Sequence, residues 1–226
     1  MTIVAGKPLV CYGIDAMLAA GIDIIIIVYS EHTKDMLALS EQNAVYKKAL
    51  SFVRFEGEGK IKTLLCAERH VQTPFVVAYG DSVIQADFFL DMLKGIDGKH
   101  ADAFICTVDN PSIPIDEVKQ PWDRSIFVKD GRVIKWYKGG VSKSDDITEE
   151  ERKECGKAGG IVYVYNVEPF IFIKECLAIG KDSHAGFIAK FIEQHNVLAM
   201  LIEDIWDIDY AEDLARTKEL LSQRRI

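Results

Sequence analysis

The sequence has little of what marks several common classes of protein. Its 226 residues include five cysteines, an odd number at wide spacings with no Cys-x-x-Cys pair. This pattern favours reduced, mostly buried thiols in a cytoplasm over a disulfide framework or a zinc site. Only 6 prolines are present, and no low-complexity tract marks a linker. We therefore expect residues 1–226 to form a single cytoplasmic domain.

Basic clusters and long apolar runs are also lacking. The formal net charge is −8 and the pI is about 5.2, with Lys and Arg scattered along the chain, which disfavours a nucleic acid as partner. The most apolar stretch, "GIDIIIIVYS" (residues 21–30), contains Asp23 and is far shorter than the roughly 20 residues that a membrane span needs. It is predicted to be a buried strand, and no membrane is expected as partner.

Two signatures of catalysis or cofactor binding are missing as well. No Gly-x-Gly-x-x-Gly follows a predicted strand, so a plain dinucleotide-binding domain receives less weight. His70, His184 and His195 have no partners at ligand spacing, and no Ser, His and Asp arrangement supports nucleophilic catalysis. These histidines are interpreted as structural.

What the sequence does contain is an alternation of helical and strand patterns. Apolar residues at helical spacing predict a helix that starts at Pro8 and stops at Gly21. Residues 44–55 fit either a helix or a strand, and Asp130-Gly131 predicts a hairpin turn. At 49% hydrophobic residues the chain can bury a sizeable core. The fold class predicted is α/β, with a mostly parallel sheet, helices on both faces and a small antiparallel insertion.

Carboxylates follow two of the predicted strands, at the edge where such sheets bind ligands. Asp81 comes after an apolar strand and Gly80, although a turn in which Asp81 accepts from nearby amides is the alternative. Asp207 lies between a later strand and a helix that begins near Ala211, where Asp209 is assigned the capping role. Mg²⁺ takes one or two carboxylates plus water and phosphate oxygens. Asp81 and Asp207 are therefore the predicted catalytic pair and metal ligands.

Five blocks of sequence together resemble one enzyme family. They are, in order, "AGKPLVCYGIDAMLAAGIDIIIIV", "PFVVAYGDSVIQADF", "VIKWYKGG", "AGGIVYVYN" and "IWDIDYAEDL". The chain looks like the sugar-phosphate nucleotidyltransferases, or NDP-sugar pyrophosphorylases, which include glucose-1-phosphate thymidylyl- and uridylyltransferases and mannose-1-phosphate guanylyltransferases. The resemblance implies a three-layer Rossmann-like fold. It also implies Mg²⁺-dependent transfer of a nucleotidyl group from a nucleoside triphosphate to a sugar 1-phosphate, with release of pyrophosphate.

The resemblance implies further substrate contacts. Gly59 falls in the segment that matches a base-contacting loop, with a flexible turn as the alternative. Lys138 lies where relatives contact the sugar phosphate, although a solvated hairpin lysine fits equally. Gly80 allows close approach of a ligand, and Gly159 and Gly160 leave space for a sugar ring unless they only kink the strand entrance.

The sequence also departs from the family at its beginning. Relatives place a strand and a Gly-rich loop with Arg and Lys before the element that "GKPL" (residues 6–9) matches. Such a loop holds the triphosphate, and removing its strand predicts exposed sheet edges. Lys7 is retained as a candidate substrate contact, with a solvated lysine as the alternative.

Two hypotheses therefore stay open. In the first, the protein is a sugar-phosphate nucleotidyltransferase whose recorded start is too late or whose missing part is supplied otherwise. In the second, it is a catalytically silent binding or regulatory subunit of the same fold. A homo-oligomer is compatible with both, and the sugar and the base are left open.

Overall fold

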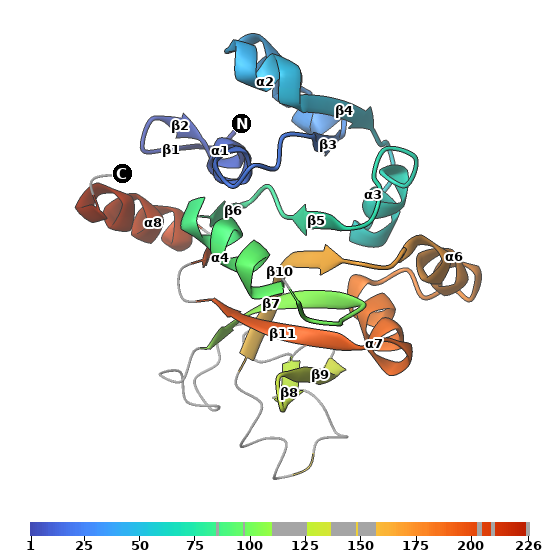
Figure 1. The fold of residues 1–226 in the computed structure, drawn as a ribbon. Coiled ribbons are helices and arrows are strands. Elements are labelled where there is room, and N and C mark those ends of the chain that lie inside the picture. Colours follow the sequence, from blue (N-terminus) through green and yellow to red (C-terminus); the bar gives the residue numbers. More distant parts are fainter. Residues whose placement is uncertain are drawn as a thin grey trace. The chain divides into compact units, whose positions relative to one another are not determined.

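The computed structural model describes residues 1–84, 86–96, 98–109, 126–136, 148, 157–202, 205–208 and 211–224 (Figure 1). Contacts group the chain into two compact units. Unit 1 comprises Met1–Glu56, Ala78–Gly95 and Asp204–Ile226, and unit 2 comprises Gly57–Val77 and Ile96–Glu203. The single domain over residues 1–226 stays a prediction, and the two units are described one by one.

Unit 1 begins with a feature that the sequence did not predict. The opening residues form a small antiparallel hairpin of β1 (Ile3–Val4) and β2 (Lys7–Pro8). Its turn residues Ala5 and Gly6 have φ values of 47° and 83°, as a two-residue hairpin turn requires. The usual Asn-Gly signal is absent because alanine takes the first position. The predicted helix follows as α1 (Leu9–Ala19), with Pro8 at its N-cap.

A parallel strand pair forms the next part of unit 1. The predicted buried strand is β3 (Ile25–Tyr29), which pairs in parallel with β4 (Leu50–Arg54). Between them lie the 3₁₀ helix η1 (Glu31–Glu41) and α2 (Ala44–Ala49), so the ambiguous residues 44–55 form a helix and then a strand. Their apolar side chains form one core cluster with α1: Cys11, Ile14, Ile25, Ile27, Leu39, Tyr46 and Leu50.

The β3 strand has one open edge within the described part of the chain. It pairs with β4 alone, and Ile24 immediately before it is 75% exposed. That this edge results from a missing strand stays a prediction. Unit 1 is completed by β6 (Ser82–Ile84), α4 (Ala86–Ile96), β12 (Ile205–Asp207) and α8 (Ala211–Arg224).

Unit 2 contains a six-stranded sheet in the order β5-β10-β7-β11-β9-β8. Figure 1 shows β7 between β10 and β11. The predicted hairpin turn is confirmed, because Asp130 and Gly131 both have positive φ between β8 and β9. The elements of this unit are α3 (Lys60–Cys66), β5 (Phe75–Ala78), β7 (Ala103–Asp109), β8 (Ile126–Lys129), β9 (Arg132–Trp136), β10 (Lys157–Tyr165), α6 (Phe170–Ala178), α7 (His184–Gln194) and β11 (Val197–Ile202).

The α/β class with a central sheet flanked by helices is confirmed, but the predicted strand direction is corrected. Parallel pairing joins β3 to β4 and β7 to β11, whereas β7–β10, β8–β9, β8–β10, β9–β11, β6–β12 and β1–β2 are antiparallel. A continuous apolar run shows that a strand is buried on both faces but not which way its neighbour runs. Among the described helices, none is both long and apolar enough to cross a membrane.

Candidate functional site

Of the two predicted metal-binding aspartates, Asp207 ends strand β12 of unit 1 and Asp81 immediately precedes strand β6. Strand β6 pairs antiparallel with β12, and Ser82 stands opposite Asp207 in this ladder. One residue further along, the backbone N–H of Ile208 donates to the carbonyl oxygen of Asp81 at 3.1 Å. Asp81 itself is exposed in the turn that leads into β6. Residues far apart in the sequence are therefore brought side by side at one end of a short ladder.

Gly80 precedes this ladder and lies against α1. A Cβ atom at Gly80 would meet Cγ2 of Val10 at 3.5 Å, which is an ordinary van der Waals contact. The position is exposed and its φ is not in the left-handed region, so packing does not require glycine here. Close approach of a ligand to the backbone stays the predicted reason for Gly80.

We expect Gly80→Ala to change the free energy of unfolding by no more than about 0.5 kcal/mol, because the new methyl group fits against Val10. If a ligand approaches this backbone, the same methyl group should weaken nucleotide binding. Thermal denaturation and nucleotide titration of the variant measure the two effects separately. A large loss of stability would contradict the packing, and unchanged affinity would remove Gly80 from the binding site.

Lys7 is held by side chains of unit 1. Its Nζ lies 2.5 Å from Oδ2 of Asp15 on α1 and 4.5 Å from the ring centre of Tyr12. Oδ1 of Asp15 accepts a hydrogen bond of 2.5 Å from the hydroxyl of Tyr46 on α2. Burial, followed by this hydrogen bond, raises the pKa of Tyr46, so the phenol stays protonated and remains a donor. Asp15 therefore joins Lys7 to α2.

This arrangement bears on the predicted role of Lys7. Val10 faces Gly80, whereas Asp15 is five residues further along α1 and so about 140° around the helix. The partner of Lys7 thus lies on a different face of α1 from the one that contacts Gly80. Lys7 as a substrate contact stays a prediction, and it would require the ammonium group to leave Asp15.

We expect Tyr46→Phe to lower the free energy of unfolding by about 1 kcal/mol, since it removes one hydrogen bond while Asp15 remains partly hydrated. Urea denaturation measures this change. Asp15→Asn is the matched variant, because it keeps an acceptor for Tyr46 but removes the charge that pairs with Lys7. If Tyr46→Phe were neutral, the hydrogen bond would not stabilise unit 1.

Asp81 and Asp207 at the β6–β12 ladder are the predicted ligands of Mg²⁺. Within the described residues, no three His, Cys, Asp or Glu side chains gather as a complete protein-supplied site. Mg²⁺ does not need one, because it uses one or two carboxylates and keeps water or phosphate oxygens in its other positions. The ladder brings the backbone of Asp81 next to Ile208 and that of Asp207 opposite Ser82. Asp81 and Asp207 as ligands of Mg²⁺ stay a prediction.

Gly59 lies in unit 2, at the start of α3. Its φ of 101° is in the region that glycine adopts readily, so a side chain here would strain the backbone. The carbonyl oxygen of Gly59 accepts from the backbone N–H of Thr63 at 3.0 Å and from Oγ1 of Thr63 at 3.1 Å. These bonds fix the end of the segment that resembles a base-contacting loop. A contact between Gly59 and a base stays a prediction.

The predicted sugar-side residues are only partly described. Gly159 and Gly160 lie in β10, with Gly159 opposite Thr107 on β7. The register of this pair shifts between Gly159 and Tyr163, so the strand is irregular where a kink was the alternative explanation. Lys138 lies outside the described residues, as does Asp209. The roles of Lys138, Gly159 and Gly160 in sugar binding stay predictions.

His184 has surroundings that the sequence did not reveal. It begins α7, and its ring centre lies 5.1 Å from that of Tyr163 on β10 and 6.3 Å from that of Trp136 on β9. Burial, with a smaller contribution from the charge of Lys60, lowers the pKa of His184 to about 4. The imidazole is therefore neutral near pH 7. Nothing in the sequence alone indicates that α7, β9 and β10 meet at His184.

His195 has a structural role, as predicted. Its Nδ1 lies 3.2 Å from Oδ2 of Asp102, and the same oxygen accepts from the backbone N–H of Asn196 at 2.8 Å. The ring stacks on Phe191 with centres 4.2 Å apart. Asp102 and Asn196 precede β7 and β11, so this contact fixes the start of the parallel pair in unit 2.

Comparison with known proteins supplies the fold. No protein-family model matches the chain, and no curated protein matches it. Among solved structures, apo UDP-glucose pyrophosphorylase superposes with a TM-score of 0.79 at 13% identity, covering 100% of this chain and 90% of that one. The fold is that of the sugar-phosphate nucleotidyltransferases.

Two further structures agree with this nucleotidyltransferase fold. UDP-glucose pyrophosphorylase complexed with UDP-glucose gives a TM-score of 0.78 at 15% identity, with the same coverage of 100% and 90%. The inositol-1-phosphate CTP transferase from T. maritima gives 0.73 at 15% identity and covers 98% of this chain and 85% of that one. The resemblance recognised in five short blocks of sequence is thus confirmed for the fold.

Proposed function

We propose that this protein transfers a nucleotidyl group from a nucleoside triphosphate to a sugar 1-phosphate, giving an NDP-sugar and pyrophosphate. The observation that carries the proposal is the β6–β12 ladder, which sets Asp81 beside Ile208 and Asp207 opposite Ser82. A fold can serve many functions, so the argument depends on this pair of carboxylates at the end of a ladder.

In the proposed reaction, Asp81 and Asp207 would hold a Mg²⁺ ion carried with the triphosphate, and the ion would supply positive charge at the phosphate oxygens. An oxygen of the sugar phosphate attacks the α-phosphate, and pyrophosphate leaves. Gly80 lets the nucleotide approach the backbone, and Gly59 does the same for the base. Lys138 contacts the sugar phosphate, while Gly159 and Gly160 leave room for the sugar ring. We place the reaction in the cytoplasm.

A second candidate is a catalytically silent protein that binds nucleotide or sugar nucleotide as a sensor or regulatory subunit. The observation that favours it is the ion pair between Lys7 and Asp15. In this pair the ammonium group of Lys7 is bound to a carboxylate and is not available to a triphosphate. Binding without turnover is the expected behaviour in that case.

The experiment that separates the two is pyrophosphate release measured with Mg²⁺ over a panel of nucleoside triphosphates and sugar 1-phosphates. The 226-residue protein and a version extended upstream in frame are assayed side by side, and nucleotide binding is followed by thermal shift. Pyrophosphate release by either version supports the enzyme. Binding without release in both supports the silent subunit, and absence of both effects contradicts the two candidates.

A further inference from the structure

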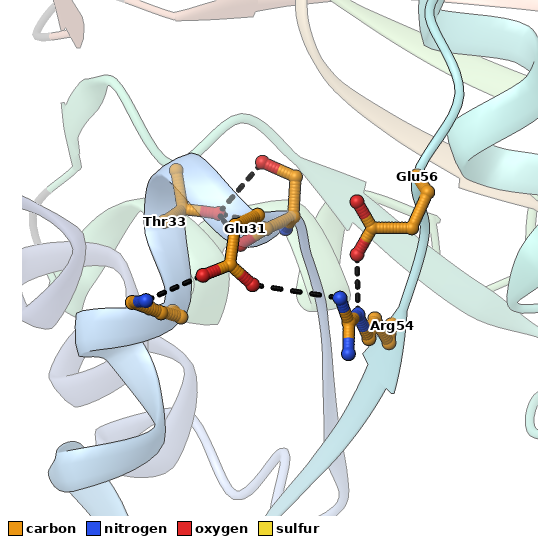
Figure 2. Close-up of polar contacts among 6 residues, drawn as sticks. Glu31, Thr33, Arg54 and Glu56 are labelled. Carbon is orange, nitrogen blue, oxygen red and sulfur yellow. Dashed lines mark hydrogen bonds and ion pairs between the residues drawn. The ribbon is translucent and has the colours of Figure 1, made fainter.

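A network of charged side chains lies at the carboxyl ends of β3 and β4, the parallel strands of unit 1 (Figure 2). The ladder continues one residue beyond β4, because the N–H of Phe55 donates to the carbonyl oxygen of Tyr29 at 2.8 Å. After Glu56 the chain leaves unit 1 and enters residues 57–59, which include two glycines. The network therefore lies beside the last hydrogen bond between the two strands, that of Phe55 with Tyr29.

Arg54 is the centre of this network. Its Nη2 lies 3.4 Å from Oε2 of Glu31, and its Nε donates to Oε1 of Glu56. Figure 2 shows the guanidinium group of Arg54 between the two carboxylates. Because the guanidinium group is planar and presents its donors in a fixed geometry, contacts at two of its nitrogens fix its orientation. Arg54 thus links Glu31, the first residue of η1, to Glu56, the residue that leads into the loop.

Glu31 is itself held in place. The backbone N–H of Ser30 donates to Oγ1 of Thr33 at 2.9 Å, which fixes the first turn of η1 around Glu31. Oε1 of Glu31 also accepts from Lys34, so the carboxylate has a cation at each oxygen. The carboxylate that Arg54 contacts is therefore held within the first turn of η1.

The segment 57–59 depends on anchors at its two ends. Glycines at 57 and 59 give the backbone more freedom than other residues would. At the far end, Thr63 donates two hydrogen bonds to the carbonyl oxygen of Gly59. At the near end, Arg54 binds Glu56 and Glu31. The contacts of Arg54 and of Thr63 therefore lie on either side of residues 57–58.

We propose that Arg54 is a positioning residue, which through Glu31 and Glu56 fixes the direction in which the chain enters the loop of residues 57–59. The effect on substrate rests on the proposed function, in which this loop contacts the base. Side chains of Glu31, Arg54 and Glu56 are 53%, 58% and 54% exposed, and each exposed ion pair changes an equilibrium by at most about fivefold. The network is thus too weak to decide folding but strong enough to order a loop.

The test uses Arg54→Met, which keeps a long apolar stem and removes both contacts. Amide hydrogen exchange of residues 55–59 should become about three- to tenfold faster, while exchange in β3 and α1 stays unchanged. Arg54→Lys should give a smaller increase, since a lysine ammonium reaches one carboxylate but not both. About 1 M NaCl should accelerate exchange of these residues in the unaltered protein but add little in Arg54→Met.

Lys94→Met is the matched control, because it removes a cation from an exposed ion pair elsewhere in unit 1, with Asp91 at 3.2 Å. This variant should leave exchange of residues 55–59 unchanged. The proposal is overturned if Arg54→Met leaves that exchange unchanged, or if it accelerates exchange equally throughout β3 and β4.

An activity readout tests the functional half. In a protein that releases pyrophosphate, Arg54→Met should raise KM for the nucleoside triphosphate about three- to tenfold with kcat nearly unchanged. A fall in kcat at constant KM would contradict loop positioning. If the unaltered protein releases no pyrophosphate, the proposed function fails, and the exchange experiment still decides the role of Arg54.

Discussion

Asp81→Asn and Asp207→Asn should each lower the rate of pyrophosphate release by at least about 100-fold while leaving the fold intact. A bound metal supplies several kcal/mol of charge stabilisation in phosphoryl and nucleotidyl transfer, and each 1.36 kcal/mol corresponds to about tenfold in rate. Asparagine keeps the size of the side chain but lacks the negative charge that holds Mg²⁺. Steady-state kinetics with varied Mg²⁺ measures the loss.

Asp87→Asn is the matched control for this pair. Asp87 is an exposed aspartate in the first turn of α4, close in the sequence to Asp81. Its replacement should leave turnover and Mg²⁺ dependence unchanged. Near-normal turnover in both Asp81→Asn and Asp207→Asn would refute the metal assignment, whichever substrates the protein uses.

Acidification between about pH 6.5 and about pH 4 should destabilise unit 2 through His184. The pKa of this imidazole is 6.5 in an ordinary setting and about 4 in the folded protein, where burial comes first among the causes and Lys60 second. The unfolded chain therefore takes up the proton first as the pH falls. The stabilising contribution of neutral His184 to the free energy of unfolding is complete above pH 6.5 and declines towards pH 4. The decline is about 3 kcal/mol at most, since the side chain of His184 is partly exposed.

The measurement is urea denaturation across this pH range for the protein and for His184→Gln. Carboxylates of the chain also take up protons on acidification. The difference in free energy of unfolding between the two proteins therefore isolates the contribution of His184. That difference should shrink as the pH falls, because glutamine has no proton to gain. His32→Gln replaces an exposed histidine of η1 and should follow the unaltered protein throughout. A parallel pH course for His184→Gln would contradict a lowered pKa of this imidazole.

Local patterns in the sequence determined most of the individual elements. The helix ending before Gly21, the strand at residues 25–29 and the turn at Asp130-Gly131 all follow from short-range chemistry: helical spacing, apolar runs and residues that accept positive φ. The carboxylates at 81 and 207 were visible for the same reason, because each directly follows a recognisable run. The family resemblance added the fold, which the structural comparison confirms.

Only the tertiary structure decided which strands pair and in which direction. The strands β6 and β12 have three residues each, too few for a periodic pattern, yet their ladder is what sets Asp81 beside Ile208. Direction was also hidden, since an apolar strand buried on both faces packs equally well beside a parallel or an antiparallel neighbour.

Partners of charged and polar side chains were likewise fixed by the fold. Lys7 with Asp15, Arg54 with Glu31, and His184 with Tyr163 each join different elements of one unit. The sequence by itself therefore determined many of the individual helices, strands and turns, and it supplied the candidate site residues. The tertiary structure decided which of those groups meet, because contacts between distant segments depend on strand order and register, and neither is encoded in local spacing.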